Sequence, residues 1–492
     1  MAPTVTIAQG TLEGRSVGEV SAFLGVPYAA APYGPLRFAP PARHPGWHGV
    51  RPATGLGPTA LKRPYPPPFD KLLPDPEIPG QECLNLNVWT PAAGGARLPV
   101  MVWIHGGAFL YGSNAVPEYD GTAFARAGVV CVSINYRLGI DGFALVPGAV
   151  ANRGLLDQVA ALAWVQDNIA AFGGDPDRVT IFGESAGGMS VTTLLSMPRA
   201  EGLFARAIAQ SGAGQHVHSR TTAQTVTAAV AQHLGVTPDR EGFAGAPLEA
   251  LLDAQAAVVA AVNTSPDPTQ WGELIRNQMP FEPVVDGEIL PAVPLEGIRH
   301  SGGASADVLI GTNRDENRLF MVPTGIMDLV DDNLLILGAG VFGLPATSVE
   351  RYKAARPGAS AGEVLCAIAT DWTFRVPAIR VAEARHGAQG RTWMYEFTWP
   401  TPALGGRLGA CHALEIPFVF RNLIGPMMEG VPAGTDGLAD AMHGSWVRFA
   451  TDGDPGWASY DTGRRATMRF DLQLRVVDDP AGEERALWDG LR

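Results

Sequence analysis

Cysteine is scarce in this chain, and its scarcity excludes two ways of stabilising a fold. Only four occur among the 492 residues, at Cys83, Cys131, Cys366 and Cys411. They are too few and too widely spaced for a disulfide framework or a zinc site. No H-E-x-x-H, paired C-x-x-C or P-loop pattern occurs either. We therefore expect reduced thiols, no metal and no other cofactor.

Basic residues are also in the minority. The chain has 36 Lys and Arg against 49 Asp and Glu, a formal net charge of −13. Neutralising nucleic-acid phosphates needs clustered Lys and Arg, so nucleic acid is not an expected partner. Charged residues make up only 17% and hydrophobic residues 46%, which excludes a disordered or coiled-coil protein.

Targeting and membrane signals are missing from the first residues. Residues 1–10 (MAPTVTIAQG) contain no basic region and no apolar helical stretch. We expect a soluble, cytoplasmic protein with a small-molecule substrate and no membrane partner, either a monomer or a small homo-oligomer. No repeat or low-complexity linker divides the chain, so one domain spanning residues 1–492 is predicted.

Buried strands and amphipathic helices alternate in the first half of the chain. Residues 99–104 and 129–134 are nearly continuous apolar runs, typical of central strands covered on both faces. Residues 155–171 have apolar positions at helical spacing and end at a Gly-Gly pair. This order predicts the α/β class, with a mostly parallel sheet and helices on both of its faces.

Other segments complete the expected organisation. Antiparallel strands are predicted near the N-terminus, at 4–14 and 21–28, and an irregular surface path over the proline-rich residues 29–79. The later predictions are strands at 207–211, 307–311 and 392–398, helical insertions at 222–234 and 248–262, and a helix at 441–450.

The pentapeptide Gly183-Glu184-Ser185-Ala186-Gly187 lies between an apolar β-branched run and a helical pattern. A serine at the apex of such a turn is strained, and small residues on either side let the strand and the helix approach each other. The turn would expose the Ser185 hydroxyl above the carboxyl edge of the sheet. It would also place the Ala186 N–H at a helix N-terminus, where it can stabilise an oxyanion. The pattern predicts a nucleophilic serine.

A second glycine-rich turn, residues 105–109 (HGGAF), directly follows an upstream strand. Small residues at that place allow two backbone N–H groups to turn inward, whereas bulky side chains would block the approach. This turn is therefore the predicted oxyanion hole.

A nucleophilic serine also needs a histidine base, which follows the acid in chain order for this kind of fold. His412 lies in a loop after the last predicted strand, where a base above the sheet should be. His386 lies in a polar turn and His443 in a predicted helix, so a solvated and a structural role explain them better. His412 is the predicted base.

The acid that orients the base is predicted in the loop after residues 308–310. Asp315 and Glu316 are adjacent there, at the carboxyl end of a strand. Spacing alone does not choose between them.

Several motifs in order resemble the type-B carboxylesterase and lipase family, and most closely its bacterial para-nitrobenzyl-type carboxylesterases. The matching segments are FLGVPYA (23–29), GPLRF (34–38), ECLNLNV (82–88), NYRLG (135–139), GGDP (173–176), QSG (210–212) and FATDGDP (449–455). The resemblance implies an α/β-hydrolase fold and a serine carboxylesterase that forms an acyl-enzyme with short- to medium-chain esters.

The resemblance also implies roles for individual residues. In the family's Gly-x-x-x-Asp-Glu-Gly segment the glutamate orients the histidine, which selects Glu316 as the acid, although Asn317 replaces the final glycine. Ser185 is the implied nucleophile and His412 the implied base. The implied oxyanion donors are the backbone N–H groups of Gly107, Ala108 and Ala186. Beside them, Ser211 matches a serine near the acid and the histidine, and Glu184 a buried carboxylate beside the nucleophile.

Two departures from the family bear on compartment and substrate. Secreted relatives pair the cysteine equivalent to Cys83 with an upstream cysteine, and none precedes Cys83 here. Cholinesterases carry a tryptophan about ten residues before that cysteine to bind a quaternary ammonium group. This chain has Leu73 near that place, so choline esters are not the favoured substrates.

Other interpretations of the sequence compete with esterase activity. Amidase, lactonase or xenobiotic-ester hydrolysis would use the same triad, and a non-catalytic binding homologue would have lost it. Residues 334–343 (LLILGAGVFG) match the dinucleotide pattern G-x-G-x-x-G, but Leu344-Pro345 follows where a helix should continue. A flexible loop over the active-site mouth is expected there. Cys411, beside His412, has no surrounding elbow and is expected to be structural.

Overall fold

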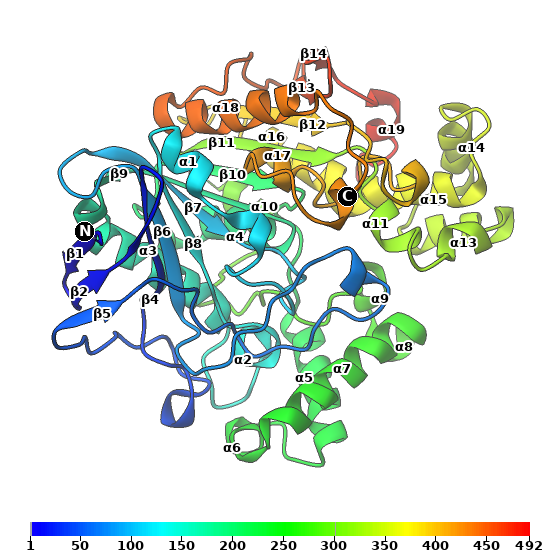
Figure 1. Ribbon diagram of the computed structural model, residues 1–492. Helices are drawn as coiled ribbons and strands as arrows, with labels where there is room; N and C mark the ends of the chain where they lie inside the picture. The colour runs from blue at the N-terminus through cyan, green and yellow to red at the C-terminus, as the bar shows by residue number, and fades with distance from the viewer. Residues whose placement is uncertain (1, 301) are drawn as a thin grey trace.

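An eleven-stranded sheet forms the centre of the computed structural model, which describes residues 2–300 and 302–492 (Figure 1). Its parallel strands, in spatial order, are β8 (Val130–Ile134), β7 (Leu98–Ile104), β9 (Gly174–Glu184), β10 (Arg206–Gln210), β11 (Asp307–Asn313), β12 (Thr392–Phe397) and β13 (Ala466–Phe470). The antiparallel edge strands are β14 (Arg475–Asp478) on one side and β6 (Asn85–Thr90), β4 (Val20–Pro27) and β3 (Arg15–Val17) on the other.

Both faces of the sheet are covered, which explains the continuous apolar runs in the sequence. In β7, Val102 and Ile104 belong to one hydrophobic cluster and Met101 and Trp103 to another on the opposite face. The first cluster includes residues of α3 (Arg153–Asn168) and α4 (Ala186–Ser196), and the second includes residues of α18 (Asp436–Asp452). The predicted α/β class with a mostly parallel sheet is confirmed.

The predicted N-terminal hairpin and helical insertions are also present. β1 (Thr4–Ile7) and β2 (Gly10–Glu13) pair antiparallel. The insertions are α5 (Arg220–Leu234) and α7 (Leu248–Thr264), which stand beside each other below the sheet in Figure 1. Sequence reasoning did not identify β13, β14 or α16 (Val376–Ala384).

Residues 334–343 are not a flexible loop, so that prediction is wrong. They lie largely within helix α13 (Asp332–Val341). The Asp331 side chain caps this helix by accepting the Leu334 N–H at 2.8 Å. Because the first two of the motif's three glycines, Gly338 and Gly340, lie inside the helix, the motif forms no phosphate-binding turn after a strand.

Length and apolar composition decide whether a helix could span a membrane. Among the described residues no single helix has the length and apolar composition required. The pair formed by α13 and α14 (Ala346–Ala354), bent by 117° at the break, meets those two criteria together.

The proline-rich segment is irregular, as predicted, but it is not confined to the surface. Its short regular pieces are η1 (Gly34–Leu36), β5 (Val50–Pro52) and η2 (Phe69–Lys71). Ala53 and Lys62 are buried. Backbone hydrogen bonds to the sheet make this possible: the Leu24 N–H donates to the Ala53 carbonyl at 2.8 Å.

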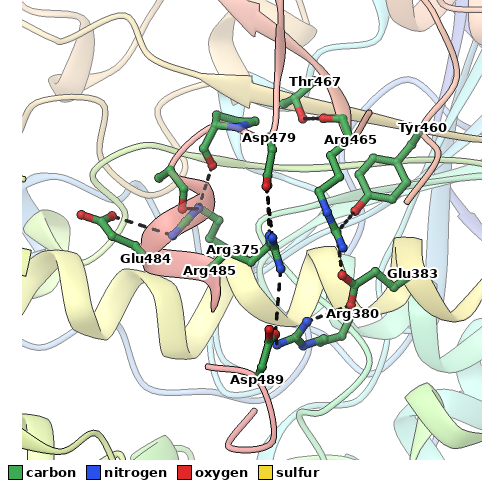
Figure 2. Close-up of polar contacts among 12 residues, drawn as sticks. Arg375, Arg380, Glu383, Tyr460, Arg465, Thr467, Asp479, Glu484, Arg485 and Asp489 are labelled. Atoms are coloured by element: carbon green, nitrogen blue, oxygen red, sulfur yellow. Dashed lines mark hydrogen bonds and ion pairs between the residues drawn. The ribbon is translucent and has the colours of Figure 1, made fainter. Parts of the chain in front are cut away.

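Ion pairs tie the last residues of the chain to α16 (Figure 2). Arg380 contacts Asp489 at 2.7 Å, and Arg465 contacts Glu383 at 2.6 Å. Each partly exposed pair contributes about 1 kcal/mol or less on its own. In the terminal helix α19 (Gly482–Ala486), Glu484 pairs with Arg356 and Arg485 with Asp479, and these pairs fix the helix in place.

Candidate active site

Ser185 is the single residue between β9 and α4, at the carboxyl edge of the sheet. Its backbone has φ 56° and ψ −124°, a region that residues with a side chain rarely adopt. The glycines on either side are required by space. A Cβ on Gly187 would lie 2.0 Å from the Ile104 carbonyl oxygen, and one on Gly183 would lie 2.6 Å from the same atom. The predicted strand–turn–helix is therefore present.

The turn after β7 lies directly against this serine. A Cβ on Gly106 would lie 3.0 Å from the Ser185 Cβ. Ala108 and Phe109 both have positive φ, 53° and 58°, which is unusual for residues other than glycine. Within the described part of the chain, the N–H groups of Gly107 and Ala108 have no protein acceptor. The Ala186 N–H, at the first position of α4, has no partner within its own helix either.

His412 and Glu316 form a buried hydrogen-bonded pair. The His412 Nδ1 lies 2.7 Å from Glu316 Oε2. The other carboxylate oxygen, Oε1, accepts the Asn313 N–H at 2.7 Å. Both oxygens of Glu316 are thereby fixed, so the imidazole has a defined orientation and tautomer.

Asp315 points in another direction. Its Oδ2 accepts the Ala410 N–H at 2.9 Å and also pairs with Arg314 at 2.9 Å. The Asp315 side chain is 18% exposed, whereas that of Glu316 is 0% exposed. The structure therefore joins Glu316, not Asp315, to the histidine, as the family resemblance implied.

Glu184 brings a second carboxylate close to the histidine. Its Oε1 lies 3.1 Å from His412 Nε2, but in a direction that makes no hydrogen bond. Among the described residues the Ser185 hydroxyl does not hydrogen-bond to His412 either. The Nε2 edge of the ring therefore faces the serine turn without being fixed by a hydrogen bond.

The protonation of this cluster is coupled. Burial lowers the pKa of His412, but the charges of Glu184 and Glu316 outweigh burial and raise it above the ordinary 6.5. Burial raises the pKa of Glu184 well above 4.5, although His412 opposes that rise. Glu184 and His412 thus compete for a proton.

Two aromatic rings pack beside the buried His412 ring. The Phe374 ring centroid lies 4.6 Å and the Phe320 centroid 5.3 Å from that of His412. Phe320 in turn approaches Phe69 of the proline-rich segment at 6.4 Å. These rings limit the space beside the base.

A buried polar network behind the histidine was missed by sequence reasoning. Asn313 Nδ2 donates to Glu415 Oε2 at 2.6 Å, and Gln210 Nε2 donates to Glu415 Oε1 at 3.1 Å. Gln210 is the last residue of β10 and Asn313 the last residue of β11. A polar side chain at the carboxyl end of a buried strand was the sequence signal that could have indicated this network. The Ser211 hydroxyl, by contrast, is buried without a hydrogen-bond partner among the described residues.

The competing candidates lie outside the site. The His443 Nδ1 bonds the Val419 carbonyl at 2.8 Å, which fits a structural role, and His386 is exposed. Cys411 is a buried free thiol, like the other three cysteines. In the described residues, no group of three or more His, Cys, Asp or Glu side chains is arranged to hold a metal ion.

Comparison with known proteins gives a consistent result. The model of a family described as the carboxylesterase family matches residues 1–488. The para-nitrobenzyl esterase of Bacillus subtilis is 37% identical over 98% of this chain and 97% of its own. The phenmedipham hydrolase of Pseudarthrobacter oxydans is 37% identical over 92% of this chain and 90% of its own. Among solved structures, a carboxylesterase of Geobacillus stearothermophilus is similar at a TM-score of 0.87 and 39% identity, with 99% of both chains covered.

Proposed function

The chain belongs to the carboxylesterase family and is a carboxylic-ester hydrolase with the α/β-hydrolase fold, and from this premise we propose that it works through a Ser185–His412–Glu316 triad. The 2.7 Å contact between His412 Nδ1 and Glu316 Oε2 carries the proposal. It holds the imidazole with Nε2 toward the serine turn, which is the arrangement a serine hydrolase needs.

In the proposed mechanism His412 Nε2 takes the proton of the Ser185 hydroxyl as its oxygen attacks the ester carbonyl. A bond forms between Ser185 Oγ and the carbonyl carbon, while the π electron pair of the carbonyl moves onto the carbonyl oxygen. When this tetrahedral intermediate collapses, the C–O bond to the alcohol breaks and His412 returns the proton to the alcohol. Water, activated by the same histidine, then hydrolyses the acyl-enzyme.

The oxyanion of each intermediate would be stabilised by the N–H groups of Gly107, Ala108 and Ala186. None of the three N–H groups has a protein acceptor among the described residues, and this, with the positive φ of Ala108, supports the assignment. Donors held in place before the reaction need no reorganisation when charge develops, and removing one costs about a hundred- to a thousandfold in rate.

We propose short- to medium-chain acyl groups as preferred substrates. The likeness to a para-nitrobenzyl esterase supports this choice, and the Phe320 and Phe374 rings beside His412 offer an apolar surface to the acyl chain. Phenmedipham is a second compound to assay, since one relative is named as its hydrolase.

The testing experiment measures initial rates on para-nitrophenyl esters from acetate to palmitate. Wild type is compared with Ser185→Ala, Glu316→Gln and Asp315→Asn. We expect Ser185→Ala to abolish activity and Glu316→Gln to lower kcat by up to about ten-thousandfold, by analogy with the acid of serine proteases. Asp315→Asn should stay close to wild type, because an asparagine oxygen can still accept the Ala410 N–H.

Two outcomes would contradict the proposal. Activity that survives Ser185→Ala would refute the nucleophile. Wild-type activity in Glu316→Gln together with loss in Asp315→Asn would refute the choice of acid.

A further inference from the structure

Lys62 and Asp75 form an ion pair deep inside the proline-rich segment. Their side chains are 1% and 3% exposed, and Lys62 Nζ contacts Asp75 Oδ1. A pair taken out of water in this way does not by itself stabilise a fold, since desolvation offsets the attraction. Its position relative to the site is more informative.

The carboxylate of this pair also binds residues 105–112, here called the oxyanion turn, which contain the proposed donors Gly107 and Ala108. Asp75 Oδ1 accepts the N–H of Gly112 at 3.1 Å. Its other oxygen, Oδ2, is buried without a hydrogen-bond partner among the described residues. Asp75 is therefore held by Lys62, and the backbone N–H that it accepts belongs to Gly112, at the end of this turn.

Gly112 is in close contact with Gly106, which itself packs against Ser185. With φ +85°, it lies so near Gly106 that an added Cβ would be 2.5 Å from the Gly106 carbonyl oxygen. Gly106 in turn lies against the Ser185 Cβ. A shift of Gly112 would therefore displace the backbone that carries the Gly107 and Ala108 N–H groups.

Other contacts fix the rest of this turn from outside. The Tyr136 hydroxyl donates to the His105 carbonyl at 2.8 Å at its beginning, and the Gly139 N–H donates to the Phe109 carbonyl at 2.7 Å. Asp75 supplies the side-chain acceptor at its far end. Two residues further on, the Asn114 N–H donates to Asn135 Oδ1 at 2.8 Å, so the part of the turn that Asp75 fixes is Gly112 itself.

The same ion pair closes the loop formed by residues 62–75. One step further out, the Thr59 N–H donates to the Ile78 carbonyl at 3.0 Å, and the Ile78 N–H donates to Thr59 Oγ1 at 3.2 Å. All four cysteines are free thiols, so no disulfide closes the loop. Within the loop, Tyr65 stacks on Tyr111 of the oxyanion turn with ring centroids 4.4 Å apart.

We propose that Asp75, buried beside Lys62, is a positioning residue that holds the oxyanion turn in its reactive conformation by accepting the Gly112 N–H. The proposal rests on the proposed function above. It differs from a purely structural role because it places the effect of Asp75 on the transition state rather than on folding.

The test compares two double variants that both remove the buried charges. Lys62→Met/Asp75→Asn keeps a side-chain oxygen for the Gly112 N–H, whereas Lys62→Met/Asp75→Leu does not. Neither variant leaves a lone buried charge, which would be the main threat to folding. Three quantities are measured: the midpoint of thermal unfolding, kcat and KM on para-nitrophenyl acetate, and Ki for a trifluoromethyl ketone. That ketone binds by forming an oxyanion with the serine.

We expect Lys62→Met/Asp75→Leu to lose about ten- to a hundredfold in kcat, as a small displacement of a reacting geometry costs. The ketone Ki should rise by the same factor while KM changes little. Lys62→Met/Asp75→Asn should stay near wild type in both. Equal kcat and equal Ki in the two folded variants would overturn the proposal. If the leucine variant does not fold, a raised Ki in the asparagine variant, whose acceptor is intact, would overturn it too.

Arg63→Met is the matched control. Arg63 is adjacent to Lys62 in the chain and also forms an ion pair, with Asp253 at 2.5 Å, but that pair is exposed. Arg63→Met should therefore leave kcat and Ki unchanged. Labelling of wild type with a fluorophosphonate probe separates the two proposals. No label on Ser185 would refute the proposed function, whereas a labelled Ser185 with equal Ki in the double variants would refute only the role of Asp75.

Discussion

The unusual residue of the site is Glu184, a carboxylate immediately before the proposed nucleophile. Serine hydrolysis requires a neutral histidine at the start of the reaction. A charged Glu184, 3.1 Å from Nε2, favours the protonated imidazole and so works against that requirement. The pH at which activity appears therefore depends on which of the two groups holds the proton.

Glu184→Gln should move the acidic limb of the pH profile. In wild type the nearby carboxylates raise the pKa of His412 above 6.5, so activity falls as pH drops through that raised value. Removing the Glu184 charge lowers the pKa of His412, and the acidic limb should shift to lower pH. The measurement is kcat/KM between about pH 5 and 10, which reports groups of the free enzyme.

Glu201→Gln, at an exposed position, is the control and should leave the profile unchanged. An unshifted limb in Glu184→Gln would mean that Glu184 is already protonated in wild type. Its burial, which raises its pKa, would then have outweighed the attraction of His412.

From the residues alone, the sequence predicted Ser185 as nucleophile and His412 as base but left the acid open, and the family resemblance then selected Glu316. Asp315 and Glu316 share one loop, and the decisive difference is which side chain points inward. That direction depends on Asn313 and on the 410–412 loop, which lies about a hundred residues away in the chain. The Asn313–Glu415 bond, 102 residues apart in sequence, was invisible for the same reason.

The strand–turn–helix around Ser185 depends on glycines that no other residue can replace. Gly187→Ala would put a methyl group 2.0 Å from the Ile104 carbonyl oxygen, and that atom belongs to a central strand that cannot yield. We expect loss of about 1–3 kcal/mol or more in unfolding free energy, together with loss of esterase activity. Denaturant unfolding and para-nitrophenyl acetate hydrolysis measure the two effects.

Gly444→Ala is the contrasting variant. Gly444 lies inside α18, and an added Cβ would have no neighbour within 4 Å. Alanine is the better helix former, so the unfolding free energy should rise by about 1 kcal/mol with activity unchanged. If both alanine variants behaved alike, the close approach of strand and helix would not be what requires Gly187.

Helix α13 shows where element prediction failed. The pair Leu344-Pro345 does mark the end of helical structure, since α13 stops at Val341. The start was missed because Asp331 was not weighed as an N-cap. A glycine pattern outweighed a capping residue in the sequence analysis, although the capping residue carries the local physical signal.

At the scale of the molecule, the central sheet could be predicted because each inner strand is apolar on both faces. The edge could not. β14 has mostly exposed residues, and β13 alternates weakly, so neither stands out from a surface loop in sequence. β13 is placed by pairing with β12 and by the ion pair between Arg465, next to it in the chain, and Glu383. β14 is placed by pairing with β13.

The whole molecule should behave as a protein without accessible thiols. All four cysteines are buried, and burial raises the pKa of Cys83 and of Cys366 to about 12. We expect a thiol reagent to modify none of them in the native protein at neutral pH and all four after denaturation. The midpoint of thermal unfolding should not change with reductant. Rapid native labelling, or a midpoint lowered by reductant, would contradict this.

The buried thiols make the chain a convenient starting point for single-site chemistry. Ser459 is exposed and directly precedes Tyr460, whose N–H binds the Thr392 carbonyl at the amino end of β12. That end of the sheet is opposite the edge that carries Ser185. In Ser459→Cys the new cysteine would be exposed, whereas the four native cysteine thiols are buried. A dye, or an attachment to a solid support, could then be placed there with every active site facing away from the anchor.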